Sequence, residues 1–188
     1  MSIIIDGTGS ISGVSSTGLT TAQTVTQSAI ATGVAGTGPT FSAYANAVTS
    51  VPNSSATVVQ YQVKAWDTAT CFNNTSGTVS LNGISVPAWS FAPNVAGYYQ
   101  INAGIQSQVG ALKTLEIYLN KNGGVYSYGN FTVGDPNGYC QSCVSNIIYF
   151  NGTSDSINIS AWQASGSTVN VSSGQGQTWF SAALVRSA

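Results

Sequence analysis

The sequence predicts an all-β protein in which an extended N-terminal arm precedes a two-sheet antiparallel head. Three observations support this fold class. Residues 39–188 contain repeated short runs rich in Val, Ile, Tyr, Phe and Trp, and Gly, Asn and Pro separate these runs. No run keeps the period of an amphipathic helix. Residues 1–38, in contrast, contain no aromatic residue.

Residues 1–38 are predicted to form the arm because they hold mainly Gly, Ser, Thr, Ala and small aliphatic residues, which cannot build a core of their own. Strand-like pieces at 2–5 and 11–14 are separated by Gly-rich turns. The isoleucines in the first piece are poor residues to leave in water, which favours an arm that docks on sister subunits or on a larger particle. The alternative is a mobile N-terminal tail.

The head, residues 39–188, is predicted to contain about eight or more short strands, which is typical of a β-sandwich or jelly roll. Turns are predicted at Asn82-Gly83, at Asn122-Gly123-Gly124 and at Asn151-Gly152. The expected strands are 41–47, 58–65, 78–81, 85–91, 98–109, 112–121, 125–133, 143–150, 156–163 and 178–186.

The composition argues against an enzyme. The chain has no histidine, and 5% of its residues are charged, whereas an ordinary globular domain has roughly 25%. Without histidine, Ser–His and Cys–His nucleophilic catalysis is excluded. The acidic residues are scattered along the chain, so no carboxylate pair is expected and no catalytic residue is assigned. They are Asp6, Asp67, Glu116, Asp135 and Asp155.

The basic residues argue against nucleic acid as a partner. Lys64, Lys113, Lys121 and Arg186 are far apart in the sequence, and binding to a phosphate backbone needs several cations acting together. No stretch approaches the ~18 consecutive apolar residues of a membrane span, so no membrane association is expected. The first residues lack a basic region and a long apolar region, which argues against a secretory signal.

The three cysteines do not indicate a disulfide framework, because their number is odd. Cys140 and Cys143 form a C-x-x-C that we place in a turn after Pro136-Asn137-Gly138, and Cys71 stands alone. A redox pair or half of a zinc site is one interpretation. Partly buried structural thiols are favoured, since the chain holds no second C-x-x-C and no histidine to complete a metal shell. No metal and no cofactor are predicted.

Four segments of the head carry a resemblance to a known family. They read PTFSAY at 39–44, WSFAPNVAGYY at 89–99, LEIYLNKNG at 115–123 and TWFSAALV at 178–185. In this order they resemble the complement-type globular head, a tumour-necrosis-factor-like jelly roll. The resemblance implies a jelly roll of about ten strands that associates as a tight trimer. Where the family often has Gly-Asp, residues 151–156 read NGTSDS, so a calcium site of the family is not carried over.

The resemblance also implies roles for four aromatic residues. Tyr98, Tyr99, Trp179 and Phe180 are expected to divide between the core and the trimer contacts. The alternative is that all four belong to the core of a single chain.

The N-terminal segment carries a second resemblance. The stretches IDGTGSISGV at 5–14 and TTAQTV at 20–25 resemble the opening of many tailed-phage virion proteins, which include fibres and head-decoration proteins. This resemblance implies a virion protein on the capsid surface. The leading hypothesis is a capsid decoration, or cement, protein whose partners are its own copies and the major capsid protein. The predicted capsid-anchoring residues of the arm are Ile3, Ile4, Ile5, Ile11, Val14 and Leu19.

The alternative function is a tail fibre or a receptor-binding head that recognises a glycan or a protein on the host surface. The segments 122–130 and 135–141 are rich in Asn, Tyr and Ser and could contact sugar. The simpler interpretation of both segments is a solvated hairpin loop. A segment of 38 residues is too short for a long fibre shaft, which favours decoration.

Overall fold

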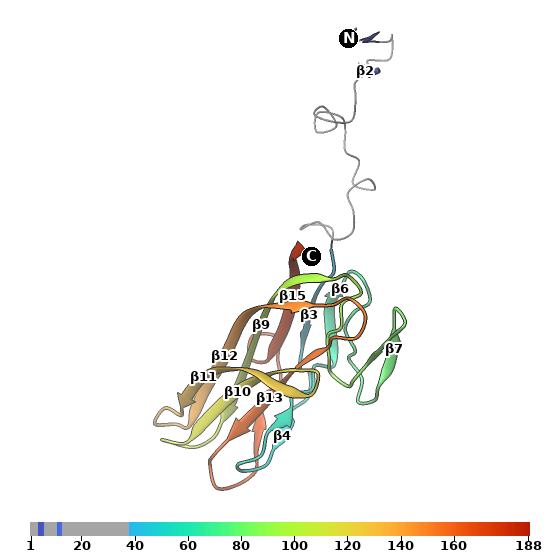
Figure 1. Ribbon diagram of the computed structural model, residues 1–188. Coiled ribbons are helices and arrows are strands. Elements are labelled where there is room, and N and C mark those ends of the chain that lie inside the picture. Colours follow the sequence, from blue (N-terminus) through green and yellow to red (C-terminus); the bar gives the residue numbers. More distant parts are fainter. Residues whose placement is uncertain (1–3, 6–10, 13–37) are drawn as a thin grey trace. The chain divides into compact units, whose positions relative to one another are not determined.

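The structure is a computed structural model that describes residues 4–5, 11–12 and 38–188 (Figure 1). The chain forms two compact units, Met1–Ala31 and Thr32–Ala188. In the first unit, β1 (Ile4–Ile5) pairs antiparallel with β2 (Ile11–Ser12), and Ile5 lies opposite Ile11. Both strands fall within the pieces predicted at 2–5 and 11–14. The predicted arm boundary at residue 38 stays a prediction.

The described residues 38–188, which include the whole predicted head, contain only strands, turns and loops, and this confirms the predicted all-β antiparallel jelly roll. The strands are β3 (Thr40–Tyr44), β4 (Thr49–Val51), β5 (Thr57–Val58), β6 (Val63–Asp67), β7 (Val79–Leu81), β8 (Ile84–Val86), β9 (Gly97–Gln108), β10 (Thr114–Lys121), β11 (Gly124–Val133), β12 (Tyr139–Phe150), β13 (Ile157–Gln163), β14 (Val169–Val171) and β15 (Trp179–Ser187).

The head consists of two sheets packed face to face. In the large sheet, β12, β9, β15, β3 and β6 lie side by side in this order, and β14 joins β9 and carries β4 on its other edge. In the small sheet the order is β11, β10, β13 and β5. The hairpin of β7 and β8 lies outside both sheets. Every strand pair is antiparallel, as expected for connections made by short turns.

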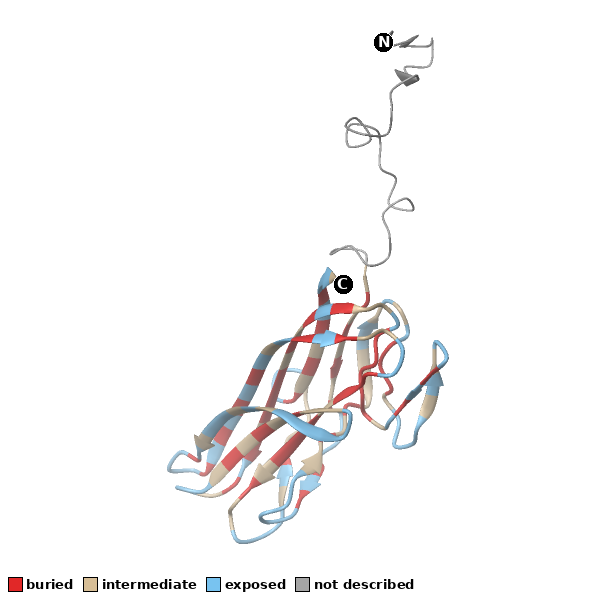
Figure 2. Ribbon diagram, viewed as in Figure 1, coloured by how far each residue is buried: buried red, intermediate tan, exposed pale blue. Residues whose placement is uncertain are grey.

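Aromatic side chains form the centre of the core between the two sheets. Along β9 and β12, buried and exposed residues alternate, so that one face of each strand points inward (Figure 2). The ring of Phe41 lies 4.6 Å from that of Phe72 and meets Phe180 edge-on at 4.8 Å. Tyr99 and Phe180 are fully buried here. Offset and edge-on ring pairs contribute about 0.5–1.5 kcal/mol each beyond their buried area.

The two sheets meet closely where β11 passes beside β12. Thr132 Oγ1 donates to the carbonyl oxygen of Gln141 at 2.9 Å, and Asn130 Oδ1 accepts a hydrogen bond from the backbone N–H of Cys143. Gly129 makes this approach possible, because a Cβ there would lie 2.2 Å from Ile117 Cγ2. Side chains of β11 therefore form hydrogen bonds with backbone groups on the edge of β12 that faces away from β9.

The predicted strand at 58–65 is wrong as a single element. It is divided between β5 in the small sheet and β6 in the large sheet. The chain crosses from one sheet to the other between them, and Tyr61 is fully buried at the crossing. The apolar alternation continues through the crossing, so it gives no sign of the change of sheet. The short strands β4 and β14 lie outside all the predicted strands.

The predicted turn around the C-x-x-C is also wrong. Cys140 and Cys143 lie on β12, where Cys140 is buried and Cys143 is exposed. Residues three apart on a strand point to opposite faces, so the two thiols cannot bind one metal ion or pair with each other. All three cysteines are free. In the described part of the chain, no helix is long and apolar enough to cross a membrane.

Candidate binding surfaces

The outward face of the large sheet is broad and almost uncharged. Across β12, β9 and β15, the strand register places Tyr149, Tyr98 and Arg186 in one row and Ile147, Gln100 and Ala183 in the next. Arg186 is the charged side chain that this face carries among the described residues. Lys64 and Asp67 of β6 lie on the inward side at the sheet edge, where their side chains pair at 3.1 Å.

Polar side chains bond to one another at the centre of this face. Gln100 Nε2 donates to Ser145 Oγ at 2.9 Å, and Ser145 Oγ donates to Asn102 Oδ1 at 2.9 Å. The rings of Tyr98 and Tyr149 lie 5.5 Å apart at one end of the face. The face thus combines exposed aromatic rings with neutral polar groups, which is the composition of a protein–protein contact with few charges at its centre.

The aromatic residues that the sequence assigned to core or trimer contacts lie on both faces of the large sheet. Tyr99 and Phe180 point into the core, whereas Tyr98 and Trp179 lie on the outward face. The indole of Trp179 packs closely against β9 at Gly104, where a Cβ would lie 2.8 Å from its Nε1. Trimer contact by Tyr98 and Trp179 stays a prediction.

The outward face of the small sheet carries a strip of aromatic side chains. Tyr118 of β10 lies opposite Tyr128 of β11, and their rings meet edge-on at 5.0 Å. Tyr128 is 63% exposed. The Tyr118 hydroxyl donates to Glu116 Oε2 at 3.1 Å, and partial burial together with this carboxylate raises the pKa of Tyr118 to about 12. Trp162 of β13 lies beside Glu116 and extends the strip.

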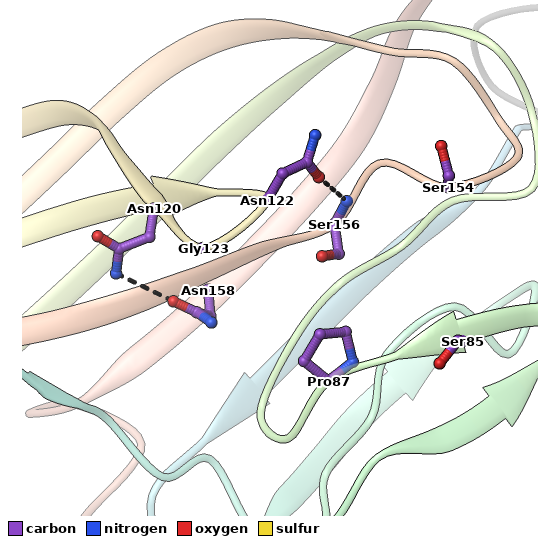
Figure 3. Close-up of a pocket in the computed structure, with 8 residues that line it drawn as sticks. All are labelled: Ser85, Pro87, Asn120, Asn122, Gly123, Ser154, Ser156 and Asn158. Carbon is purple, nitrogen blue, oxygen red and sulfur yellow. Dashed lines mark hydrogen bonds between the residues drawn. The ribbon is translucent and has the colours of Figure 1, made fainter.

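Next to this strip, the small sheet is hollowed between the end of β10, the start of β13 and the segment after β8. The hollow measures about 470 Å³ (Figure 3), within the roughly 300–1,000 Å³ of small-molecule sites. Asn120, Asn122 and Asn158 line it from the two sheet strands and the β10–β11 turn. The turn has the predicted Asn-Gly form, with φ of 53° at Asn122 and 81° at Gly123.

Hydrogen bonds hold the asparagines of the hollow in place. Asn120 Nδ2 donates to Asn158 Oδ1 at 3.0 Å, and Asn122 Oδ1 accepts from the backbone N–H of Ser156 at 2.9 Å (Figure 3). Asn122 Nδ2 also donates to Asp155 Oδ1 at 2.8 Å. Each amide orientation is fixed by at least one partner, so the lining is rigid before any ligand arrives.

The ionic groups beside the hollow neutralise each other. Lys121 Nζ lies 2.9 Å from Asp155 Oδ2, and both side chains are largely buried. Burial disfavours the ionised Asp155 carboxylate, but hydrogen bonds from Asn122, Lys121 and the Asn151 backbone outweigh it and lower the pKa of Asp155. The lining therefore presents amides and hydroxyls rather than a net charge.

The cysteine thiols are not activated. Burial raises the pKa of the Cys71 and Cys140 thiols to about 11 and also raises that of Cys143, so thiolate is scarce at neutral pH. Over residues 4–5, 11–12 and 38–188, no group of three or more Cys, Asp or Glu side chains could hold a metal ion.

The structure describes only part of the predicted capsid-anchoring set. Ile4 and Ile5 belong to β1 and Ile11 belongs to β2, whereas Ile3, Val14 and Leu19 lie outside the described residues. The segments 122–130 and 135–141 are not loops along their whole length. The first begins at the hollow and continues along β11, which contains Tyr128, and the second spans the β11–β12 turn and the first residues of β12. Most residues that line the hollow were not predicted as part of any site: Ser85, Pro87, Asn120, Ser154, Ser156 and Asn158.

Comparisons with known proteins identify the fold of the head. No family model and no curated protein matches the sequence. Solved structures do match: the head has the jelly-roll fold of tumour-necrosis-factor-like proteins and complement-type globular heads, as the four sequence segments predicted.

Three solved structures illustrate the similarity. Murine APRIL at pH 5.0 superposes with a TM-score of 0.57 and 9% identity, over 78% of this chain and 98% of its own. The globular domain of a zebrafish complement 1qA protein gives 0.53 and 13% identity, over 80% and 99% of the two chains. The Eiger TNF of S. frugiperda gives 0.51 and 9% identity, over 79% and 93%. Such low identities establish the fold alone.

Proposed function

We propose that this chain is a structural protein of a phage particle that decorates and stabilises the head as a homotrimer. The observation that carries the trimer is the broad outward face of the large sheet, which exposes Tyr98, Ile147 and Tyr149 and almost no charge. Exposed apolar surface of this kind marks contact sites between proteins. A shared three-fold contact would cover it in every copy.

The N-terminal segment attaches the trimer to the capsid in this proposal. Its isoleucines, including Ile4, Ile5 and Ile11, anchor it to the major capsid protein by apolar burial and by strand addition. Each trimer contributes three such segments, and multivalent attachment strengthens binding without a tight single contact. The role is mechanical, because the trimer ties neighbouring capsid subunits together.

The proposal is tested on particles with and without the protein. Capsids that lack it should lose DNA at a lower temperature than complete capsids and should withstand low salt less well, and complete capsids should carry hundreds of copies. Full-length protein should bind the bare capsids, and a chain lacking residues 1–30 should remain a trimer that no longer binds. Equal stability of the two particle types, or binding by the shortened chain, would contradict the proposal.

A second candidate function is a receptor-binding head of the tail. The hollow and the aromatic strip of the small sheet favour it, because both lie on the outward face opposite the proposed trimer contact. Copy number separates the two functions. A few dozen copies or fewer per particle, located at the tail, would support the receptor-binding head and exclude decoration.

A further inference from the structure

We propose that the outward face of the small sheet binds an uncharged oligosaccharide, with one sugar ring in the hollow and the next ring against Tyr118 and Tyr128. The site goes beyond the decoration function and does not depend on it. Three properties of the described residues carry the inference: the neutral lining of the hollow, its unused polar atoms, and its continuity with the aromatic strip.

The charge of the hollow selects a neutral ligand. Lys121 and Asp155 are the ionic groups beside it, and they are 2.9 Å apart and bonded to each other. A phosphate, sulfate or carboxylate ligand would have to compete with Asp155 for Lys121, and a cation would have to compete with Lys121 for Asp155. Breaking such a pair leaves a poorly solvated charge behind, so both classes are disfavoured.

The unused polar atoms match a ligand that is rich in hydroxyl groups. The Ser156 side chain is directed into the hollow although its residue is only 8% exposed (Figure 3). Within the described residues, its hydroxyl and that of Ser85 make no hydrogen bond. Asn120 donates through Nδ2 to Asn158 and Ser160, which leaves its Oδ1 as an acceptor. The hollow thus offers both donors and acceptors, as hydroxyl groups of a sugar require.

Apolar surfaces in the same place suit the carbon-bearing faces of sugar rings. Pro87 is exposed and forms one wall of the hollow (Figure 3). Along β10, Tyr118 is two residues from Asn120 on the same face, a distance of about 7 Å, so adjacent rings of one oligosaccharide can reach both residues. Ser160 connects the two places, since it lies opposite Tyr118 and accepts from Asn120 Nδ2 at 2.8 Å.

The position of the site keeps it available in the proposed trimer. Asn120 and Asn158 belong to β10 and β13 of the small sheet, and their outward face points away from the large sheet that carries the proposed trimer contact. Loss of sugar binding and loss of capsid binding can therefore be measured separately.

The test measures binding of neutral trisaccharides to the full-length protein. Maltotriose, cellotriose, mannotriose and chitotriose are screened by saturation-transfer NMR, with their monosaccharides and with sialyllactose and trigalacturonate as charged probes. We expect at least one neutral trisaccharide to bind with a dissociation constant on the order of 1 mM or below, and the charged probes to bind at least about tenfold more weakly.

Two variants locate the bound sugar. Ser85→Trp places a large ring at the exposed rim of the hollow and should weaken both the trisaccharide and its monosaccharide by about tenfold or more. Tyr128→Ala should weaken the trisaccharide about tenfold and leave the monosaccharide unchanged. Asn137→Ala in the β11–β12 turn is the matched control and should change neither. Unfolding midpoints and sedimentation confirm that each variant is folded and assembled as the parent protein is.

Three results would overturn the inference. One is that none of the four neutral trisaccharides binds. Another is that a charged probe binds as tightly as the best neutral one. The third is that binding survives both Ser85→Trp and Tyr128→Ala. Because Ser85→Trp should still bind capsids, loss of sugar binding in this variant leaves the decoration function untouched.

Discussion

The outward faces of the two sheets differ in shape and chemistry although one core supports both. The face of the large sheet is built from long ladders, in which β9 pairs with β12 along its whole length. The face of the small sheet is interrupted by bulges in the β10–β11 ladder and hollowed beside the β10–β11 turn. A regular face can pack against a neighbouring copy of the chain over a wide area, whereas a hollow with fixed amides suits a small ligand.

The largest effect should come from the core that supports both faces. Phe41→Ala removes the ring that contacts Phe72, Phe91 and Phe180, and it should lower the free energy of unfolding by about 3–5 kcal/mol. Urea titration followed by tryptophan fluorescence measures this. Phe131→Ala is the control, because Phe131 is 60% exposed and its removal should cost less than about 1 kcal/mol. Equal losses in the two variants would show that Phe41 is not central.

A charge on the outward face of the large sheet should dissociate the trimer, whereas the same charge on the small sheet should not. Asn102→Lys puts one lysine per chain at the centre of the proposed three-fold contact, where like charges cost several kcal/mol, on the order of 3. Sedimentation velocity should show trimers of the parent chain and monomers of the variant. Tyr128→Lys adds the same charge to the small sheet and should leave the trimer intact. A monomeric parent chain, or a trimeric Asn102→Lys, would contradict this assignment.

Asp155 tests the rigidity of the hollow. Its pKa is lowered in the folded protein, so its carboxylate stabilises the fold above the unfolded pKa of about 4, and this contribution is lost as pH falls through the lower folded value. Asp155→Asn should therefore lower the free energy of unfolding at pH 7 by about 1–3 kcal/mol. The difference from the parent protein should shrink at pH values near and below the folded pKa.

Urea titrations at pH 7 and at about pH 2 check the Asp155 prediction. Asp135→Asn is the matched control, since Asp135 is exposed and asparagine keeps the Oδ1 acceptor of its turn. A loss for Asp155→Asn that is the same at both pH values would mean that the ionised carboxylate does not stabilise the fold.

The smallest effect concerns the thiols of β12. Cys143 lies on the outward face of the large sheet, whereas Cys140 is buried and the pKa of its thiol is raised to about 11. Iodoacetamide at pH 8 should therefore modify Cys143 and spare Cys140. In the proposed trimer, Cys143 should react about tenfold more slowly than in Asn102→Lys. Peptide mass spectrometry over time measures the rate of Cys143 modification in the parent protein and in Asn102→Lys. Equal rates in the two proteins would place Cys143 outside the trimer contact.

Long strands could be predicted from the sequence because their alternation is local. The predicted 98–109, 112–121 and 125–133 correspond closely to β9, β10 and β11, and the Asn122-Gly123 turn joins the last two. The alternation at 58–65 continued while the chain changed sheets, so the sequence could not reveal the division into β5 and β6. Likewise, β4 and β14 are three residues each, too short to show a period.

The hollow could not be predicted because its residues meet only in three dimensions. Asn120, Asn158 and Ser85 come from different strands, and asparagine and serine are common throughout this chain, so none stands out in the sequence. The aromatic residues were easier to notice but not to orient. Tyr98 and Tyr99 are adjacent, and only the sheet register decides which one enters the core.

The hydrogen bonds that Thr132 and Asn130 make to β12 protect one edge of the large sheet. An unpaired strand edge is a template for pairing with another chain and therefore for aggregation. Here Thr132 and Asn130 engage the Gln141 and Cys143 backbone, and Lys121 Nζ donates to the carbonyl oxygen of Tyr149 at 2.8 Å. A foreign strand would have to displace all three side chains. The β12 edge is therefore protected against pairing with a strand of a neighbouring copy.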